Sequence, residues 1–171
     1  EVLGTPLKFP IMIAPSAAQA QLHPEGELAT YQGATAASET PMIVSNNASF
    51  PMDKIAATAK GPLWFQLYPR QDLAMSRSIV EGAQAAGSRA IVVTVDQQTF
   101  NYERQLHNRN LSPAPRRTSP RRAIAEASNP YRIADTRLWY DWTFIEKIRP
   151  FVKVPLLIKG VVTAEDAKLC V

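Results

Sequence analysis

Polar residues in this chain stand at the ends of short hydrophobic runs, where they could act together. An amide, a hydroxyl, a carboxylate or an amine inside an apolar run must find a partner, because burying it unpaired costs several kcal/mol. A shared polar ligand would satisfy such groups together, and ligands of parallel α/β folds bind at the carboxyl ends of the strands. The residues that follow this pattern are Asn46, Gln66, Tyr68, Thr94, Asp96 and Lys159.

Other kinds of chemistry have little support in the sequence. His23 and His107 are far apart and lack metal-ligand spacing, so we expect no metal site. The sequence contains neither a P-loop, nor G-x-G-x-x-G after a strand, nor a G-x-S-x-G elbow. The single cysteine, Cys170, is expected to be a core residue on the apolar face of a helix. One thiol cannot form an internal disulfide.

The runs that would carry these residues predict a parallel α/β fold. They are almost continuously hydrophobic, as in strands covered on both faces, and span 11–15, 42–46, 63–68, 90–96 and 155–160. Helical spacing separates them at 25–39, 51–59, 72–87 and 141–151. In the third helix Leu73, Ile79, Val80 and Ala83 are expected to be buried, with Asp72 as N-cap and Gly87 as the stop. A hairpin is expected over 1–10, and Thr163 should begin a last helix.

Length and charge narrow the class of protein. A chain of 171 residues can form a packed core, and no apolar run is long enough for a membrane-spanning helix. Residues 103–137 hold eight arginines and three acids, which leaves −1 on the rest of a chain whose net charge is +4. This proline-punctuated segment is either a solvated insertion or an anion-binding lid. Nucleic-acid binding is the weakest interpretation, because no regular basic face is present.

Five ordered motifs resemble a known family. "PIMIAPSA", "HPEGELATYQGATAA", "WFQLY", "VVTVD" and "PLLIKGVVTAEDAKL" resemble the FMN-dependent 2-hydroxy-acid oxidases and dehydrogenases, which include glycolate oxidase, lactate oxidase and mandelate dehydrogenase. The resemblance implies a (β/α)₈ TIM barrel with FMN at its carboxyl-terminal mouth. Residues 1–171 would then form a partial FMN-binding barrel with about the first five strands, and 97–141 would be a long insertion after the fourth. The chain's edges, Glu1 and Val171, are accordingly expected to be those of a fragment.

The same resemblance implies a role for each candidate residue. The backbone of Pro15, Ser16 and Ala17 would line the flavin, and Asn46 would contact it where relatives have a small hydroxyl residue. Gln66 and Thr94 would bind the pyrimidine edge of the isoalloxazine. Tyr68 would point its hydroxyl at the substrate, and Asp96 would orient a catalytic histidine. Lys159 would stabilise the reduced flavin electrostatically.

Two departures from the family pattern affect the substrate site. Tyr102 aligns with an arginine that binds the substrate carboxylate in relatives, and Arg104, two positions later, is the candidate substitute. The family's catalytic histidine follows the fifth strand and lies outside this sequence.

The function that the resemblance implies is oxidation of an L-2-hydroxy acid to the 2-oxo acid, with a hydride equivalent passing to FMN. The fragment alone would be inactive, and a missing segment or second chain would supply the rest of the barrel. The alternatives are another FMN-dependent barrel enzyme or a catalytically inactive flavoprotein-like fragment. A homotetramer in the cytoplasm is expected for the complete protein, without nucleic-acid or membrane partners.

Overall fold

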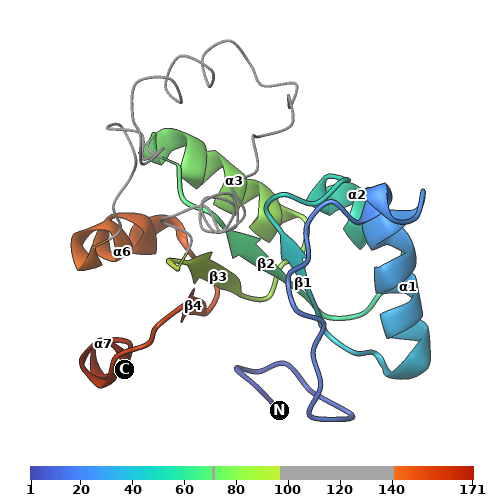
Figure 1. Cartoon of the computed structure of the whole chain (residues 1–171), viewed down its shortest axis with the longest axis horizontal. Helices are drawn as coiled ribbons and strands as arrows, with labels where there is room; N and C mark the ends of the chain where they lie inside the picture. Colours follow the sequence, from blue (N-terminus) through green and yellow to red (C-terminus); the bar gives the residue numbers. More distant parts are fainter. Residues whose placement is uncertain (71, 97–140) are drawn as a thin grey trace, which may run out of the picture. The chain divides into compact units, whose positions relative to one another are not determined.

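Four parallel strands form the centre of the fold. The computed structural model describes residues 1–70, 72–96 and 141–171, of which Glu1–Val95 and Asp141–Val171 form one compact unit. Its sheet has the order β1 (Met42–Ser45), β2 (Leu63–Leu67), β3 (Ile91–Thr94) and β4 (Leu156–Lys159), with every neighbouring pair parallel (Figure 1). Four of the five predicted strands are therefore confirmed.

The run over 11–15 forms only one isolated parallel bridge, between Ile13 and Met42. The Ile13 N–H donates to Pro41 O at 2.9 Å, and the Ile43 N–H donates to Ile13 O at 3.0 Å. The next ladder bonds on either side would need an N–H from Pro15 or from Pro41, and proline has none. The prediction of a full strand here is therefore wrong, although the segment does lie along β1.

The predicted helices are present with altered ends. The helices and two 3₁₀ turns are η1 (Gln19–Gln21), α1 (Gly26–Ser38), α2 (Met52–Ala56), α3 (Leu73–Ala85), α6 (Trp142–Ile148), η2 (Arg149–Phe151) and α7 (Ala164–Leu169). α2 is shorter than predicted, since Thr58 closes a tight turn by donating from both N–H and Oγ1 to Ile55 O. α6 passes into η2 where Pro150 removes a helix donor.

Side-chain caps begin three of these helices. Asp72 accepts from the N–H of Ala74, Asp141 from that of Phe144, and Thr163 from that of Asp166, so the predicted Asp72 and Thr163 caps are confirmed. Gly87, with φ of +93°, follows α3 as its predicted stop.

The buried face of α3 differs in one residue from the prediction. Val80 and Ala83 are buried and Ile79 is half-buried, but Leu73 is exposed. Ser76 takes its place on the buried face, because the Ser76 hydroxyl accepts from Arg70 N–H at 2.8 Å and donates to Arg70 O at 3.3 Å. A polar residue in the first turn of α3 thus fixes the loop that follows β2.

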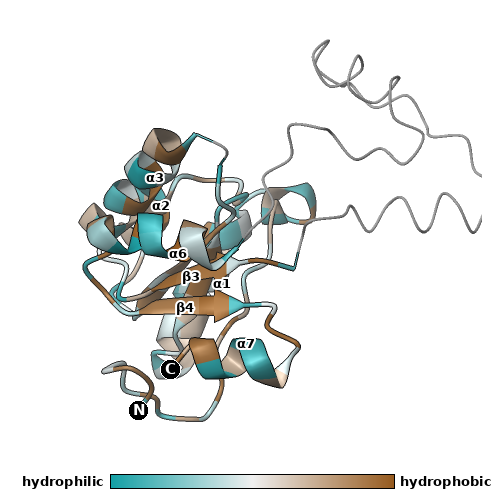
Figure 2. Cartoon of the chain, turned by 90° about the vertical axis from the view of Figure 1, so that its left-hand side faces the viewer, coloured by the Kyte–Doolittle hydropathy of each residue, from teal (hydrophilic) through white to brown (hydrophobic). Residues whose placement is uncertain are grey.

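The sheet has two apolar faces with different neighbours. Register pairs Ile43 with Trp64, and Val92 with Leu157, so these four residues share the face that we name the inner face. Met12 packs on this face from the segment before β1. The opposite face is covered by α1 beside β1 and by α3 beside β2 (Figure 1). β3 and β4 are hydrophobic along most of their length, and the hydrophilic colour returns at the end of β4 (Figure 2).

The N-terminal hairpin predicted over 1–10 is confirmed only in part, as a tight turn closed by one isolated bridge between Val2 and Thr5. Thr5 is buried and accepts a hydrogen bond from the Trp64 indole N–H at 3.1 Å. This contact joins residues 59 positions apart and anchors the turn beneath the inner face.

An amide clamp ties α3 to the start of β4. The Gln84 side chain donates from Nε2 to Phe151 O at 3.0 Å and accepts from the Lys153 N–H at 2.6 Å. Both bonds are made to backbone groups in the segment just before β4. The connection between α3 and β4 therefore does not depend on side-chain packing alone.

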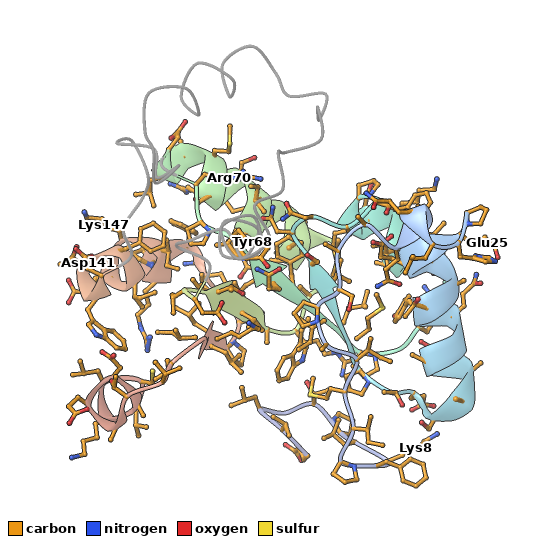
Figure 3. All side chains as sticks on the ribbon, in the orientation of Figure 1. Lys8, Glu25, Tyr68, Arg70, Asp141 and Lys147 are labelled. Atoms are coloured by element: carbon orange, nitrogen blue, oxygen red, sulfur yellow. The ribbon has the colours of Figure 1, made fainter. Side chains whose placement is uncertain are left out.

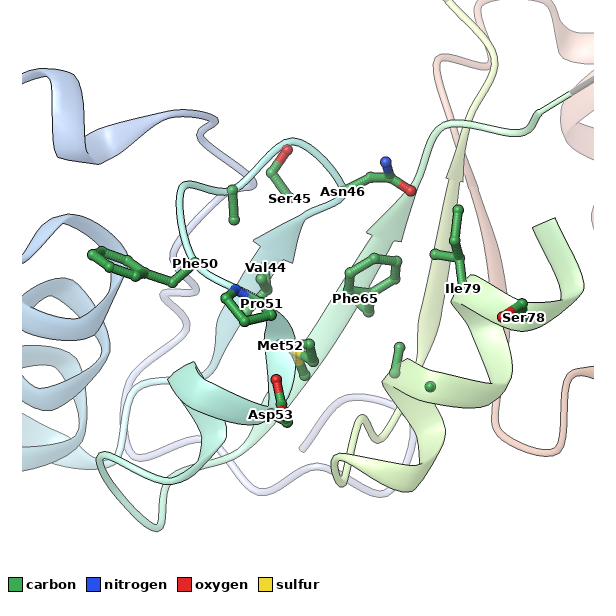
Figure 4. A pocket seen from close by; sticks show the side chains of 13 residues that line it. Val44, Ser45, Asn46, Phe50, Pro51, Met52, Asp53, Phe65, Ser78 and Ile79 are labelled. Atoms are coloured by element: carbon green, nitrogen blue, oxygen red, sulfur yellow. The ribbon is translucent and has the colours of Figure 1, made fainter. Parts of the chain in front are cut away.

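A cavity of about 300 Å³ lies on the helix side of β1 and β2 (Figure 4). Phe65 of β2, Met52 of α2 and Ile79 of α3 contribute to its largely apolar lining. Gly82 also lines it, and a Cβ at Gly82 would meet no atom within 4 Å.

Replacing Gly82 by Ala is expected to stabilise the chain by about 0.5–1 kcal/mol, because Ala loses less backbone freedom in a helix interior. Thermal or denaturant unfolding of this chain would measure the change. Gly26→Ala is the contrasting variant: its φ is +41° and a Cβ would lie 2.7 Å from Ala20 N. Stabilisation by both substitutions, or by neither, would contradict this account.

α7 leaves most of its surface uncovered by the described residues. Leu169 is exposed, and Cys170 is exposed as well, so the prediction that Cys170 is a core residue is wrong. α7 is tied to α6 by the Trp142 indole, which donates to Asp166 Oδ1 at 3.1 Å. A helix buries its apolar side only where another element meets it, and periodicity alone does not reveal whether one does. In the described part of the chain, no helix is both long and apolar enough to cross a membrane.

Candidate active site at the carboxyl ends of the strands

The sheet brings the predicted polar residues of three strands to one face. Ser45 is paired with Gln66, Gln66 with Val92, and Thr94 with Lys159. Partners in a parallel ladder share a face, and residues two apart on one strand share it too. Ser45, Gln66, Thr94 and Lys159 therefore all lie on the inner face, at its carboxyl-terminal edge, above the apolar layer of Ile43, Trp64, Val92 and Leu157.

Two of these residues have buried polar atoms without a partner. Gln66 and Thr94 are each 1% exposed. Neither Gln66 Nε2 nor Thr94 Oγ1 makes a hydrogen bond to any described residue, although an unpaired buried donor costs about 1–3 kcal/mol. Gln66 Oε1 does have a donor, the Ser45 hydroxyl at 3.3 Å, and the Asn47 N–H in turn donates to Ser45 Oγ at 3.2 Å. The Gln66 amide is thus held by its oxygen and leaves its nitrogen to donate elsewhere.

The orphaned atoms fit the pyrimidine edge of a flavin. That edge presents carbonyl acceptors beside an N–H. To bind it, the protein must hold matching donors and acceptors in the plane of the ring. Gln66 Nε2 can supply a donor, and the Thr94 hydroxyl can donate or accept. Ser45, which sequence analysis did not select, orients Gln66. Its signal was present, because it is a polar residue that ends the run "MIVS" in the same way as Thr94 ends "IVVT".

The remaining predicted residues lie at or just after the strand ends and differ in exposure. Tyr68, two residues after Gln66, is half-buried near the end of β2 (Figure 3). Asn46 is half-buried and lines the helix-side cavity (Figure 4), and its buried Oδ1 has no hydrogen-bond partner among residues 1–70, 72–96 and 141–171. Lys159 is exposed at the end of β4, and the Val95 N–H donates to its carbonyl at 3.0 Å. Asp96 is exposed and follows β3 by two residues.

Pro15, Ser16 and Ala17 follow the Ile13 bridge, with Pro15 half-buried and the other two exposed. Arg104, Tyr102 and His107 lie outside the described residues. Within residues 1–70, 72–96 and 141–171, no group of three His, Cys, Asp or Glu side chains could hold a metal ion.

A buried carboxylate, that of Glu27 at the start of α1, binds the segment before α1 and the loop after β1. Glu27 is 0% exposed, and its Oε1 accepts from the N–H groups of Gln19 and Ser49, each at 3.0 Å. Burial by itself would raise the pKa of Glu27. The N–H groups of Gln19, Ser49 and Glu27 itself, with the Ser49 hydroxyl, more than offset burial and hold that pKa below the usual 4.5.

This lowered pKa predicts acid sensitivity. A carboxylate whose folded pKa lies below its unfolded pKa contributes stability above the unfolded value, and the contribution is lost as pH falls through the folded one. The free energy of unfolding of the chain should therefore decline as pH falls below 4.5, and less steeply in Glu27→Gln. Urea unfolding from about pH 6 to about pH 3 measures both slopes. Equal slopes would show that Glu27 does not carry the effect.

Comparison with known proteins agrees with this geometry. The family model described as FMN-dependent dehydrogenase matches residues 1–171. Glycolate oxidase 1 of Oryza sativa subsp. indica is 37% identical over 184 residues, and glycolate oxidase of Spinacia oleracea is 34% identical over 181. Each match covers 99% of this chain and 48% of the relative, so the chain spans about half the length of the curated relatives it matches.

Solved structures give the same answer for the fold. Mandelate oxidase with (S)-2-phenylpropionate superimposes with a TM-score of 0.76 at 28% identity, over 99% of this chain and 46% of that one. A tyrosine-to-phenylalanine mutant of mandelate oxidase with (S)-mandelic acid gives 0.76 at 28% over the same shares. The predicted fold, a portion of a TIM barrel, is confirmed. The chain belongs to the FMN-dependent dehydrogenase family.

Proposed function

We propose that this chain is a part of an FMN-dependent enzyme that oxidises an L-2-hydroxy acid to the 2-oxo acid. The observation that carries the proposal is a pair of buried groups on adjacent strands, Gln66 Nε2 and Thr94 Oγ1, to which no described residue offers a hydrogen bond. FMN is the group whose pyrimidine edge both would bind, and when bound it accepts the hydride equivalent from the substrate. Relatives named glycolate oxidase and mandelate oxidase support the substrate class.

Each further residue would serve this chemistry from its place at the strand ends. The backbone of Pro15, Ser16 and Ala17 would line the flavin, and Asn46 would add a contact from the loop after β1. Lys159 would place positive charge near the pyrimidine edge, since its register partner is Thr94. Tyr68 would direct its hydroxyl to the substrate.

Substrate recognition and proton removal would need groups outside the described residues. Relatives bind the substrate carboxylate with an arginine, and this chain has Tyr102 at that position. Arg104 would bind the carboxylate instead. Asp96, exposed after β3, would orient a histidine as the histidine accepts the hydroxyl proton. That histidine would come with the remaining strands, from a later segment or from a second chain.

β4 offers the place where the remaining strands would join. Among the described strands it pairs only with β3, and its residues Leu156, Leu157 and Ile158 are half-buried. A further parallel strand on β4 would bury them and satisfy its open backbone groups. We name the chain together with these strands the assembled barrel. For this assembly we further propose a homotetramer located in the cytoplasm.

Anaerobic titration of the assembled barrel tests the function. Bound FMN should show the oxidised flavin spectrum and bleach on addition of glycolate, lactate or mandelate. FMN that binds but is bleached by none of these acids would indicate a different FMN-dependent barrel enzyme. No FMN binding at all would indicate an inactive flavoprotein-like barrel. This chain without the other strands should bind FMN weakly or not at all.

A further inference from the structure

Two loops with predicted flavin contacts are joined directly to each other. The first loop, residues 15–22, contains Pro15–Ala17, and the second, residues 46–51, contains Asn46. The Ala18 N–H donates to Asn47 O at 3.1 Å, and the Ala20 N–H donates to Ser49 Oγ at 3.0 Å. The two loops are therefore held together by direct hydrogen bonds.

Glu27 lies where the two loops meet. One atom of its carboxylate, Oε1, accepts a backbone N–H from each loop, that of Gln19 and that of Ser49. α1 approaches close enough because Gly26 has no side chain: a Cβ there would lie 2.7 Å from Ala20 N. Thr30, one turn further along α1, donates to Gln19 Oε1 at 2.6 Å and holds the same loop from the side.

Joining two loops with a buried carboxylate has a high desolvation free energy, since burying an anion costs far more than burying a neutral amide. Its other oxygen, Oε2, is buried and has no hydrogen-bond partner in the described part of the chain, so the cost is only partly offset. What the carboxylate supplies is a single strong acceptor shared by two N–H groups, which fixes both loops at one point. Gln19 comes two residues after Ala17, and Ser49 comes three residues after Asn46.

We propose that Glu27 is a positioning residue for the flavin: through Oε1 it sets the spacing between the loop of Pro15–Ala17 and the loop of Asn46. The inference rests on the proposed function, because it assigns to FMN the surface that the two loops form. Glu27 itself would not touch the flavin, since it is wholly buried behind both loops.

The test compares Glu27→Ala and Glu27→Gln with a control of matched character, Gln84→Leu. Gln84 also joins two backbone groups, those of Phe151 and Lys153, but it lies away from both loops. In this chain, hydrogen exchange of the Gln19 and Ser49 amides should rise at least about tenfold in Glu27→Ala and stay unchanged in Gln84→Leu. In the assembled barrel, fluorescence titration with FMN should give a Kd at least about tenfold weaker for Glu27→Ala.

The conservative variant should show partial rescue. Glu27→Gln keeps a side-chain oxygen for both N–H groups, so its Kd for FMN should lie between those of the wild type and Glu27→Ala. Faster exchange with an unchanged Kd would overturn the inference and leave Glu27 a purely structural residue. A Kd weakened equally by Gln84→Leu would overturn it too, as a general effect of stability. If the wild-type assembly binds no FMN, the proposed function itself fails, and the inference fails with it.

Discussion

Replacing Lys159 by Met in the assembled barrel is expected to slow reduction of bound FMN about 100-fold, as loss of a fixed electrostatic contact at a reacting centre typically does. Lys159 ends β4, its register partner is Thr94, and its side chain shares the inner face with Gln66 and Thr94. Its ammonium group would therefore stand beside the pyrimidine edge, where negative charge builds up as the substrate is oxidised. Methionine keeps the length of the side chain and removes the charge.

Stopped-flow reduction by the hydroxy acid under anaerobic conditions measures this effect. Lys168→Met removes a lysine from the exposed helix α7 and serves as the control, with an expected rate equal to that of the wild type. The reduction potential of bound FMN should also fall in Lys159→Met. An unchanged rate and potential in Lys159→Met would remove Lys159 from the site.

Replacing Tyr68 by Phe should reduce turnover about 100-fold and leave FMN bound, because only the hydroxyl is lost. Tyr68 follows the buried Gln66 by two residues and is half-buried, so its ring keeps its packing while its hydroxyl can reach a substrate. The loss should appear in kcat and in kcat/KM alike if the hydroxyl acts mainly in the transition state.

Tyr31→Phe is the matched control for Tyr68→Phe. The Tyr31 hydroxyl is also lost, but it donates to Gly61 O at 2.6 Å, before the amino end of β2 and not at the carboxyl ends of the strands. Its removal should lower the free energy of unfolding by about 1 kcal/mol and leave turnover unchanged. Release of FMN from Tyr68→Phe, or equal losses of turnover in both variants, would contradict the assigned role.

Most of the sheet could be predicted from the sequence because parallel strands leave a strong local signal. Runs such as "AIVVTVD" are short and hydrophobic at successive positions, which is typical of strands covered on both faces. The strand over 11–15 was overpredicted, since its composition is right but a ladder needs N–H donors at Pro15 and Pro41. Hydropathy alone does not show which residues must donate a backbone N–H to the neighbouring strand.

The candidate site was predictable where a polar residue interrupts an apolar run, as at Gln66 and Thr94. Ser45 gave the same signal but is small and common at strand ends, so its contact with Gln66 became evident only from the register. Glu27 was missed for a different reason. An acid in the first turn of a helix is ordinarily a solvated residue, and its burial depends on two loops that meet only in the folded chain.

The Gln84 clamp has a consequence for how the chain is connected. Together with the β3–β4 ladder it joins described residues that come before positions 97–140 to described residues that come after them. All of these contacts lie within the compact unit of Glu1–Val95 and Asp141–Val171. The place of β4 in the sheet therefore does not depend on the covalent connection alone. A chain whose backbone was cut between 97 and 140 would still have hydrogen bonds that hold its two pieces together.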